Sequence, residues 1–222
     1  MAEYKQKILM TEFVTHDVKR FIIEKPENYE FEPGQATEVA VAEEGWEDKK
    51  RPFTFTSLNE DKVLEFTIKG YPEHNGVTEK LHSLVSGDEL LIEDPWGTIN
   101  YQGEGVFLAG GAGVTPFIAI LRNLRNKRKL GSNELIFANK KAKDVILEKE
   151  FREMLGDNFI PILTEEEKEG YEKDYINKDY LKRNIDDFSQ NFYVCGPPNF
   201  VEDLTEALKE LGADPDEVVL EE

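Results

Sequence analysis

The sequence predicts two domains of different class: an antiparallel six-stranded β-barrel over residues 1–102, then an α/β domain with a doubly wound, parallel five-stranded sheet over residues 103–222. Two observations lead to this expectation. Short strand-like segments separated by turn-forming residues fill the first half, which is typical of a small barrel. In the second half, strand patterns alternate with helix patterns, which indicates a parallel sheet covered by helices.

The first half contains six segments rich in the apolar and β-branched residues of strands. One helix is expected between the last two of them, with Thr78 as its candidate N-cap and Gly87 beyond its end. The apolar face of this helix is expected to consist of Leu81, Leu84 and Val85. The six expected strands are Lys5–Met10, Val18–Ile23, Ala36–Val41, Phe53–Leu58, Val63–Gly70 and Glu89–Glu93.

The second half contains five strand-like segments joined by helix patterns. In a parallel sheet of this kind, ligands bind beyond the carboxyl ends of the strands. The expected strands are Val106–Ala109, Leu135–Ala138, Phe159–Leu163, Phe192–Cys195 and Val218–Leu220. The expected helices are Thr115–Lys127, Leu147–Leu155, Lys178–Arg183 and Asn199–Leu211, the last of which ends at Gly212.

A glycine-rich stretch, Gly110-Gly111-Ala112-Gly113-Val114-Thr115-Pro116, joins the first of these strands to its helix. Glycines allow a tight turn and the close approach of a ligand to the backbone, and Pro116 suits the first turn of a helix. The N–H groups at a helix start favour an anion. The stretch is therefore either a nucleotide-phosphate site or an ordinary strand-to-helix turn.

A second loop of interest, Cys195-Gly196-Pro197-Pro198, follows the fourth strand of the second half. Gly196 permits close approach of a ligand, and the prolines stiffen the turn. No His or Lys adjoins Cys195 in the sequence, so nothing indicates an activated thiol. A small buried residue is the simplest interpretation of this cysteine.

Three stretches of the first half carry possible ligand contacts. Arg51-Pro52-Phe53-Thr54-Phe55-Thr56-Ser57 offers a guanidinium for phosphate, and alternation along a strand places Phe53 and Phe55 opposite Thr54 and Thr56. Gly76-Val77-Thr78 opens the short helix and is a second candidate anion cradle. Tyr71 could stack on a base. Taken alone, Arg51 and Tyr71 are more simply interpreted as surface residues at strand edges.

The composition excludes several classes of function. The net charge of -19 should repel nucleic acid and anionic lipid. The single cysteine excludes an internal disulfide or a four-thiolate metal site, and His16, His74 and His82 lack the spacing of metal ligands. The first ten residues do not resemble a signal peptide, and no apolar run approaches a membrane span. We therefore expect a cytoplasmic protein, monomeric or weakly dimeric, without a metal.

Charged residues after two strands of the second half bear on nucleotide choice. Glu165, Glu166 and Glu167 would disfavour a ribose 2′-phosphate and suit a 2′-hydroxyl. Lys140, Lys141 and Lys143, which follow the neighbouring strand, would have the opposite effect. The choice between NADH and NADPH stays open, with a slight preference for NADH.

Four motifs in order resemble the ferredoxin–NADP reductase-like flavoproteins, particularly the short bacterial flavodoxin reductase type. They are Arg51-Pro-Phe-Thr, Gly76-Val-Thr, Gly111-Ala-Gly-Val-Thr-Pro116 and Cys195-Gly-Pro-Pro, and Asp94-Pro-Trp-Gly97 is also similar to the family. The motifs span nearly the whole chain. The resemblance implies a flavin-binding barrel and a pyridine-nucleotide domain that together transfer a hydride from NAD(P)H to flavin N5.

The resemblance also implies a role for particular residues. On the flavin side, Arg51 would bind phosphate, Phe53 would pack on the isoalloxazine, and Thr54 would hydrogen-bond N5. Pro52 would also contact the cofactor, and Ile68 and Lys69 would offer backbone contacts. Thr54 and Cys195 are the two residues expected to be catalytic. Tyr71 would lie on the adenine side, and Gly76, Val77 and Thr78 would hold the flavin pyrophosphate. On the nucleotide side, the expected contacts are Gly111, Ala112, Gly113, Val114, Thr115 and Pro116 with the pyrophosphate, and Cys195, Gly196 and Pro197 with the nicotinamide.

The chain also departs from the family pattern. Many members end in an acidic residue and an aromatic that covers the flavin, whereas this sequence reads Leu220-Glu221-Glu222, so the flavin face is expected to be open or covered differently. No built-in iron–sulfur cluster is expected, and the electrons must pass to a separate acceptor, either a small redox protein such as ferredoxin or flavodoxin, or a small molecule. The basic run at Arg122, Arg125, Lys127, Arg128 and Lys129 is either a solvated helix face or a docking patch.

The cofactor is expected to be FAD, with FMN as the less favoured choice, and NADH or NADPH to be the substrate. Two other classes of function stay open. One is a non-catalytic flavin-binding redox sensor or partner-binding subunit, and the other is an interaction domain on the same fold that binds no cofactor.

Overall fold

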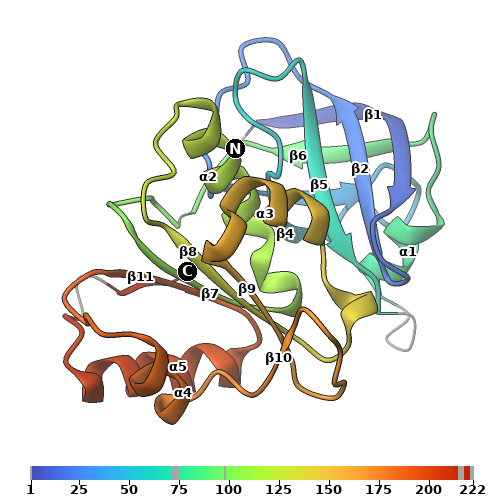
Figure 1. The fold of residues 1–222 in the computed structure, drawn as a ribbon. Coiled ribbons are helices and arrows are strands. Elements are labelled where there is room, and N and C mark those ends of the chain that lie inside the picture. The colour runs from blue at the N-terminus through green and yellow to red at the C-terminus, as the bar shows by residue number, and fades with distance from the viewer. Residues whose placement is uncertain (1, 72–75, 98, 215–217, 221–222) are drawn as a thin grey trace.

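The antiparallel sheet of the first half nearly closes on itself (Figure 1). The computed structural model describes residues 2–71, 76–97, 99–214 and 218–220. The sheet has the order β4-β3-β6-β1-β2-β5, and an isolated bridge between Phe55 and Phe66 links the chain after β4 to β5. Its strands are β1 (Glu3–Phe13), β2 (Val18–Glu24), β3 (Ala36–Val41), β4 (Arg51–Thr54), β5 (Val63–Lys69) and β6 (Glu89–Glu93).

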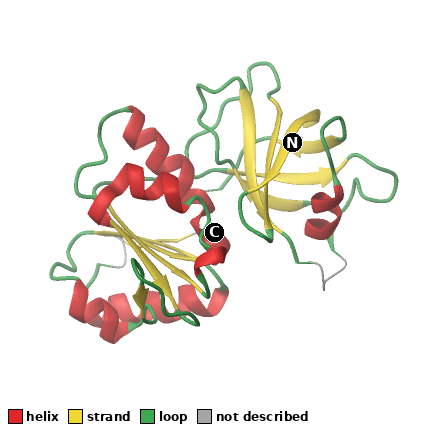
Figure 2. Cartoon of the chain, turned by 45° about the vertical axis from the view of Figure 1, so that its right-hand side comes forward, coloured by secondary structure: helices red, strands yellow, loops and turns green. Residues whose placement is uncertain are grey.

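The second sheet is parallel, with helices on both of its faces (Figure 2). Its order is β10-β9-β8-β7-β11-β12. The strands are β7 (Gly105–Gly110), β8 (Glu134–Asn139), β9 (Phe159–Leu163), β10 (Glu172–Lys173), β11 (Asn191–Cys195) and β12 (Val218–Leu220). The helices are α2 (Thr115–Asn126) and α3 (Glu148–Leu155) on one face, and α4 (Lys178–Asn184) and α5 (Pro198–Leu211) on the other.

Two expectations about strands were wrong. The parallel sheet has six strands rather than five, because the two-residue β10 pairs with the edge of β9. The strand expected at Phe53–Leu58 is Arg51–Thr54 instead. At this corner of the barrel the backbone changes partner, since Phe55 N donates to Gln35 O (3.0 Å) and Thr56 N donates to Glu65 O (2.8 Å).

The short helix of the barrel, α1 (Val77–Ser83), differs from the expectation at both of its ends. Its N-cap is Gly76 rather than Thr78, and no side chain caps it. Val85 lies beyond the helix and is 58% exposed, so it does not belong to the apolar face. Leu81 and Leu84 are buried as expected.

Two residues of the first half are part of the second half's hydrophobic core. Val18 and Ile99 belong to the same cluster as Phe107, Phe117 and Leu121 of β7 and α2. Gly34 lies at this seam with φ +99°, and a β-carbon there would lie 2.1 Å from Ile99 O. The two halves are thus packed together, although the boundary expected between residues 102 and 103 stays a prediction. None of the helices in the described ranges has both the length and the apolar character of a membrane span.

Candidate nucleotide and flavin site

A cleft of about 1080 Å³ lies between the two halves. Its walls come from the barrel and from the carboxyl-terminal ends of β7, β8, β9 and β11, which is where a doubly wound sheet binds ligands. The barrel contributes His16, Asp17, Lys69, Gly70 and Tyr71. The parallel-sheet half contributes Gly110, Gly111, Ala112, Gly113, Ala138, Asn139, Lys140, Asp144, Thr164, Cys195, Gly196, Pro197, Pro198 and Phe200.

The glycine loop and the cysteine loop touch each other at Gly113. A β-carbon on Gly113 would lie 2.4 Å from both Cys195 O and Gly196 N. A β-carbon on Gly196 would lie 2.7 Å from the ring of Phe200. Such distances are far inside van der Waals contact, so the glycines are required by the packing of the two loops.

The backbone after β7 forms a short 3₁₀ helix, Gly111–Val114, that runs directly into α2. Gly111 has φ +53°, which favours glycine, and a β-carbon there would meet open space. No side chain caps either helix start. The N–H groups that a helix start leaves unpaired are therefore available to an anion.

Asn139, the last residue of β8, carries a buried amide whose Nδ2 has no hydrogen-bond partner among the residues that the structure describes. The residue is only 6% exposed and lines the cleft. Leaving such a donor unpaired costs about 1–3 kcal/mol, so a native structure that keeps one usually has a ligand, water or function that explains it. A polar ligand in the cleft would supply the missing acceptor.

Several carboxylates lie close to the cleft where the chain follows β8 and β9. Lys140 Nζ lies 3.5 Å from Glu165 Oε1, and Glu166 Oε2 accepts a hydrogen bond from Ala142 N (2.7 Å). Asp144 Oδ1 lies 3.7 Å from Nδ1 of His16, which belongs to the barrel. The local charge is therefore mixed, and both lysines that line the cleft are paired, Lys140 with Glu165 and Lys69 with Asp17 (2.9 Å).

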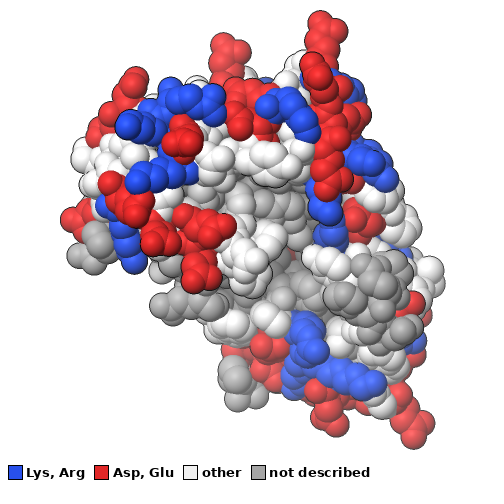
Figure 3. All heavy atoms as spheres, turned by 90° about the horizontal axis from the view of Figure 1, so that it is seen from below, with Lys and Arg blue, Asp and Glu red and all other residues white. Residues whose placement is uncertain are grey.

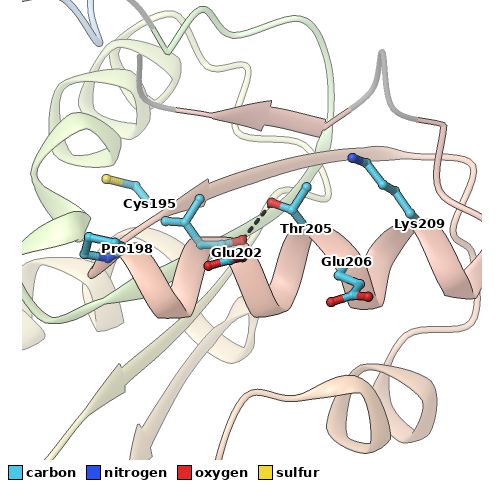
Figure 4. Close-up of a pocket in the computed structure, with 8 residues that line it drawn as sticks. Cys195, Pro198, Glu202, Thr205, Glu206 and Lys209 are labelled. Carbon is cyan, nitrogen blue, oxygen red and sulfur yellow. Dashed lines mark hydrogen bonds between the residues drawn. The ribbon is translucent and has the colours of Figure 1, made fainter.

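Cys195 lies between two cavities. Besides the cleft, it lines a second cavity of about 610 Å³ that follows α5 from Pro198 to Lys209 (Figure 4). The cysteine is 2% exposed, in line with its interpretation as a small buried residue. Thr205, on the same helix, donates to Val201 O (2.7 Å).

Four of the barrel residues expected to contact a flavin, Arg51 to Thr54, lie on β4. Arg51 is exposed, and within the described part of the chain it forms no ion pair; its Nη1 donates to Lys50 O (2.7 Å). Phe53 is half-buried against the barrel core. Thr54 is 6% exposed and pairs with Ala36 of β3.

The end of β5 is held against α1 by His82. Its Nε2 lies 2.9 Å from Ile68 O, and its ring packs so closely on Gly70 that a β-carbon there would lie 2.6 Å from Nδ1. Burial lowers the pKa of His82. Lys19 fixes the end of α1, since its Nζ donates to Leu84 O (2.6 Å) and His82 O (3.1 Å).

The structure gathers some of the expected site residues in the cleft and leaves others outside it. Those lining the cleft are Lys69, Tyr71, Gly111, Ala112, Gly113, Cys195, Gly196 and Pro197. Those that do not line it are Arg51, Pro52, Phe53, Thr54, Ile68, Gly76, Val77, Thr78, Val114, Thr115 and Pro116. His74, Glu221 and Glu222 lie outside the described residues.

Several residues that line the cleft were not predicted from the sequence. Asn139 ends β8 and Thr164 directly follows β9, so the rule that ligands bind at the carboxyl ends of the strands could have identified them. His16 and Asp17 come from the loop between β1 and β2 and carry no such signal.

The interpretation of Arg122 as part of an exposed basic run was wrong, because its side chain is 18% exposed and paired with Glu65 and Glu150. Arg125, Lys127, Arg128 and Lys129 are exposed at the end of α2 opposite the glycine loop. On the face shown in Figure 3, acidic and basic side chains are interspersed around a largely uncharged centre.

Comparison with known proteins matches both halves to cofactor-binding families. The model of the oxidoreductase FAD-binding domain matches residues 5–101, and that of the oxidoreductase NAD-binding domain matches residues 107–206. An NADH-cytochrome b5 reductase 2 of Aspergillus niger is 29% identical, over 96% of this chain and 75% of the relative. The reductase component of the naphthalene 1,2-dioxygenase system of Pseudomonas putida, a ferredoxin–NAD(P)(+) reductase, is 26% identical, over 96% and 67%.

The fold is also that of solved reductases. The ferredoxin NADP+ reductase of Neisseria gonorrhoeae, solved with bound FAD and NADP, superposes with a TM-score of 0.85. It is 21% identical, and the match covers 99% of this chain and 98% of that one. At this identity the likeness establishes the fold alone.

Proposed function

The chain belongs to the ferredoxin–NADP reductase-like family of flavoprotein oxidoreductases, and from this premise we propose which residues carry its reaction, which nucleotide it prefers and what receives the electrons. The protein is an FAD-dependent NAD(P)H oxidoreductase that passes electrons to a separate acceptor. FAD, when bound, supplies the chemistry by taking a hydride from the nicotinamide at its N5 atom.

The observation that carries the proposal is the meeting of three segments in one cleft. The glycine loop at Gly110–Gly113, the cysteine loop at Cys195–Pro197 and the end of β5 at Lys69–Tyr71 all line it. Uncapped N–H groups, glycines without room for a side chain and the unpaired amide of Asn139 fit a phosphate-bearing, polar ligand.

The residues divide into two groups by role. Gly111 to Thr115 hold the nucleotide pyrophosphate through backbone N–H groups, and Cys195, Gly196 and Pro197 flank the nicotinamide. On the barrel, Arg51 binds the flavin phosphate as a fixed charge, Thr54 orients N5 with its hydroxyl, and Gly76 to Thr78 provide further N–H donors. The protein thus contributes position and electrostatics, which account for much of the acceleration when two reactants are held in contact.

NADH is the proposed substrate in preference to NADPH. Lys140 already pairs with Glu165, and Asp144 presents a further carboxylate to the cleft. A 2′-phosphate entering here would meet the carboxylates of Glu165 and Asp144, whereas a 2′-hydroxyl could donate to one of them.

The proposed acceptor is a separate one-electron carrier, protein or small molecule. The net charge of -19 favours partners whose docking face is basic. We expect reduction of a cationic protein acceptor to slow as salt rises, because screening weakens long-range attraction, and reduction of an anionic acceptor to show the opposite trend. Steady-state rates with cytochrome c, cytochrome b5 and a ferredoxin across ionic strengths test this expectation.

The primary experiment is anaerobic mixing of the FAD-loaded protein with NADH and, separately, with NADPH. Rapid loss of the oxidised-flavin absorbance, faster or at lower concentration with NADH, is the expected result. A protein that takes up no FAD, or whose bound FAD is not bleached by either nucleotide, contradicts the proposal.

A further inference from the structure

Arg122 of α2 reaches across the seam between the two halves. Its Nη1 donates to Thr56 O (2.7 Å) and to Glu65 Oε1 (2.7 Å), both in the barrel half. Its Nε and Nη2 donate to the two carboxylate oxygens of Glu150 on α3, at 2.6 and 2.8 Å. One guanidinium therefore ties together α2, α3, β5 and the chain that follows β4.

These contacts fall next to the segments that hold the two cofactors. Thr56 lies two residues after Thr54, and Glu65 lies on β5 three residues before Ile68. On the other side, Arg122 is seven residues into a helix that starts at Thr115, directly after the glycine loop. At 1.5 Å per residue, about 10 Å of rigid helix connects this anchor to the nucleotide loop.

The partners of Arg122 are themselves fixed. Thr56 Oγ1 donates to Glu65 Oε1 (2.8 Å), and Arg20 Nη1 lies 3.7 Å from Glu65 Oε2. Glu65 is 8% exposed and Thr56 is fully buried. Only a planar guanidinium offers this fork of donors, because a lysine ammonium is a point charge on a flexible stem.

We propose that Arg122 is a positioning residue that sets the spacing between the flavin-binding strand and the nucleotide loop. The inference rests on the proposed function, because it assigns the two rings to these segments. Hydride transfer needs the reacting atoms about 3–3.5 Å apart, and a misplacement of about 1 Å can slow a reaction about 100-fold. Loosening this anchor therefore slows the hydride step and leaves each cofactor's own contacts intact.

The kinetic test compares Arg122→Met and Arg122→Lys with Arg152→Met in the FAD-loaded protein. Arg152 is a matched control, since its bonds to Glu148 (2.8 Å) and Gly170 O (2.9 Å) stay within the nucleotide half. We expect the rate of flavin reduction at saturating NADH to fall about 10- to 100-fold in Arg122→Met and less in Arg122→Lys. The NAD⁺ and FAD dissociation constants should change less than about threefold, and Arg152→Met should keep the wild-type rate.

A distance measurement tests the same inference without any turnover. Spin labels at the exposed Lys62 of the barrel and Lys149 of α3 report the spread of distances between the halves. We expect a narrow distribution in the wild type and in Arg152→Met, and a broader one in Arg122→Met and Arg122→Lys.

The outcomes separate the two proposals. If NADH fails to bleach the wild-type flavin, the proposed function fails, and the distance distributions alone decide the role of Arg122. If Arg122→Met does not fold, Arg122→Lys decides. A saturating rate in the folded variants equal to that of the wild type, or a loss of rate explained entirely by weaker NAD⁺ or FAD binding, overturns the inference.

Discussion

At the nucleotide loop, backbone packs directly on backbone: Gly113 leaves no room for a β-carbon beside Cys195 and Gly196. At the flavin strand, by contrast, the main candidate contact is the exposed side chain of Arg51, with a hydrogen bond to its neighbour's carbonyl. The proposed nucleotide side is therefore formed by the fold itself, whereas the proposed flavin side relies on an exposed side chain. Substitutions should thus damage folding and binding together on the first side, and binding alone on the second.

The largest effect is expected for Gly113→Ala. The new methyl group would force the two loops apart, which costs about 1–3 kcal/mol of unfolding free energy. It should also weaken NAD⁺ binding about 10- to 100-fold, the effect of losing one hydrogen bond of about 1.5–3 kcal/mol to a charged phosphate. Calorimetric titration with NAD⁺ and thermal unfolding measure the two effects. Gly87→Ala is the control: its methyl group also meets open space and the residue does not line the cleft, so it should show only the roughly 1–2 kcal/mol cost of its positive φ and an unchanged NAD⁺ affinity. Equal behaviour of the two variants would break the comparison.

Arg51→Ala probes the flavin side. Loss of a charge-assisted hydrogen bond, about 1.5–3 kcal/mol, predicts an FAD dissociation constant about 10- to 100-fold higher. The melting temperature of the FAD-free protein should stay unchanged, because Arg51 is exposed. Fluorescence titration with FAD measures the dissociation constant, and thermal unfolding of the FAD-free protein measures stability. A destabilised FAD-free variant would contradict the prediction.

Asn139→Leu separates binding from folding on the nucleotide side, because NAD⁺ binding should weaken while the stability of the ligand-free protein is kept or rises. Replacing a buried, unpaired amide with an apolar side chain of similar size should leave the ligand-free protein as stable or more stable. Losing one hydrogen bond to the nucleotide should weaken NAD⁺ binding about 2- to 12-fold. Binding isotherms and denaturant unfolding with wild type as the reference measure the two. Unchanged NAD⁺ affinity would show that the amide does not contact the nucleotide.

The smallest expected effect concerns pH and His82. Its folded-state pKa is lowered by burial, so the unfolded state binds the proton more readily. Stability linked to His82 is therefore present above its unfolded pKa of about 6.5 and is lost as pH falls below that value. Melting temperatures between about pH 5 and 7 should show a steeper acid-side decline in the wild type than in His82→Gln, whose amide does not titrate. Parallel curves would show that another group causes the decline.

Much of the nucleotide side could be predicted from sequence, because its signals are local. Three glycines between a strand and a proline-started helix leave a readable pattern, and the structure places them at the end of β7 as expected. Beyond the glycines, Asn139 was missed because an unpaired amide is visible only once its surroundings are known. The two-residue β10 has no period to detect, and its pairing depends on β9.

The position of Arg122 also could not be predicted from local sequence. Its neighbours in sequence are basic, so the pattern suggested an exposed run. Its partners Thr56 and Glu65 are 66 and 57 residues away along the chain, and only the packing of the two halves brings them together. The end of β4 before Phe55 was not predicted for a similar reason, because the backbone there changes its strand partner, which depends on contacts with distant parts of the chain.

Val18 and Ile99 have a consequence for protein engineering. Both precede the expected boundary, yet both fill the hydrophobic cluster beneath α2. A chimera that joins this barrel to a relative's nucleotide domain at residue 102 would bring two foreign side chains into that cluster. Exchange of domains within the family should therefore succeed only when the residues at positions 18 and 99 come from the same protein as the nucleotide domain.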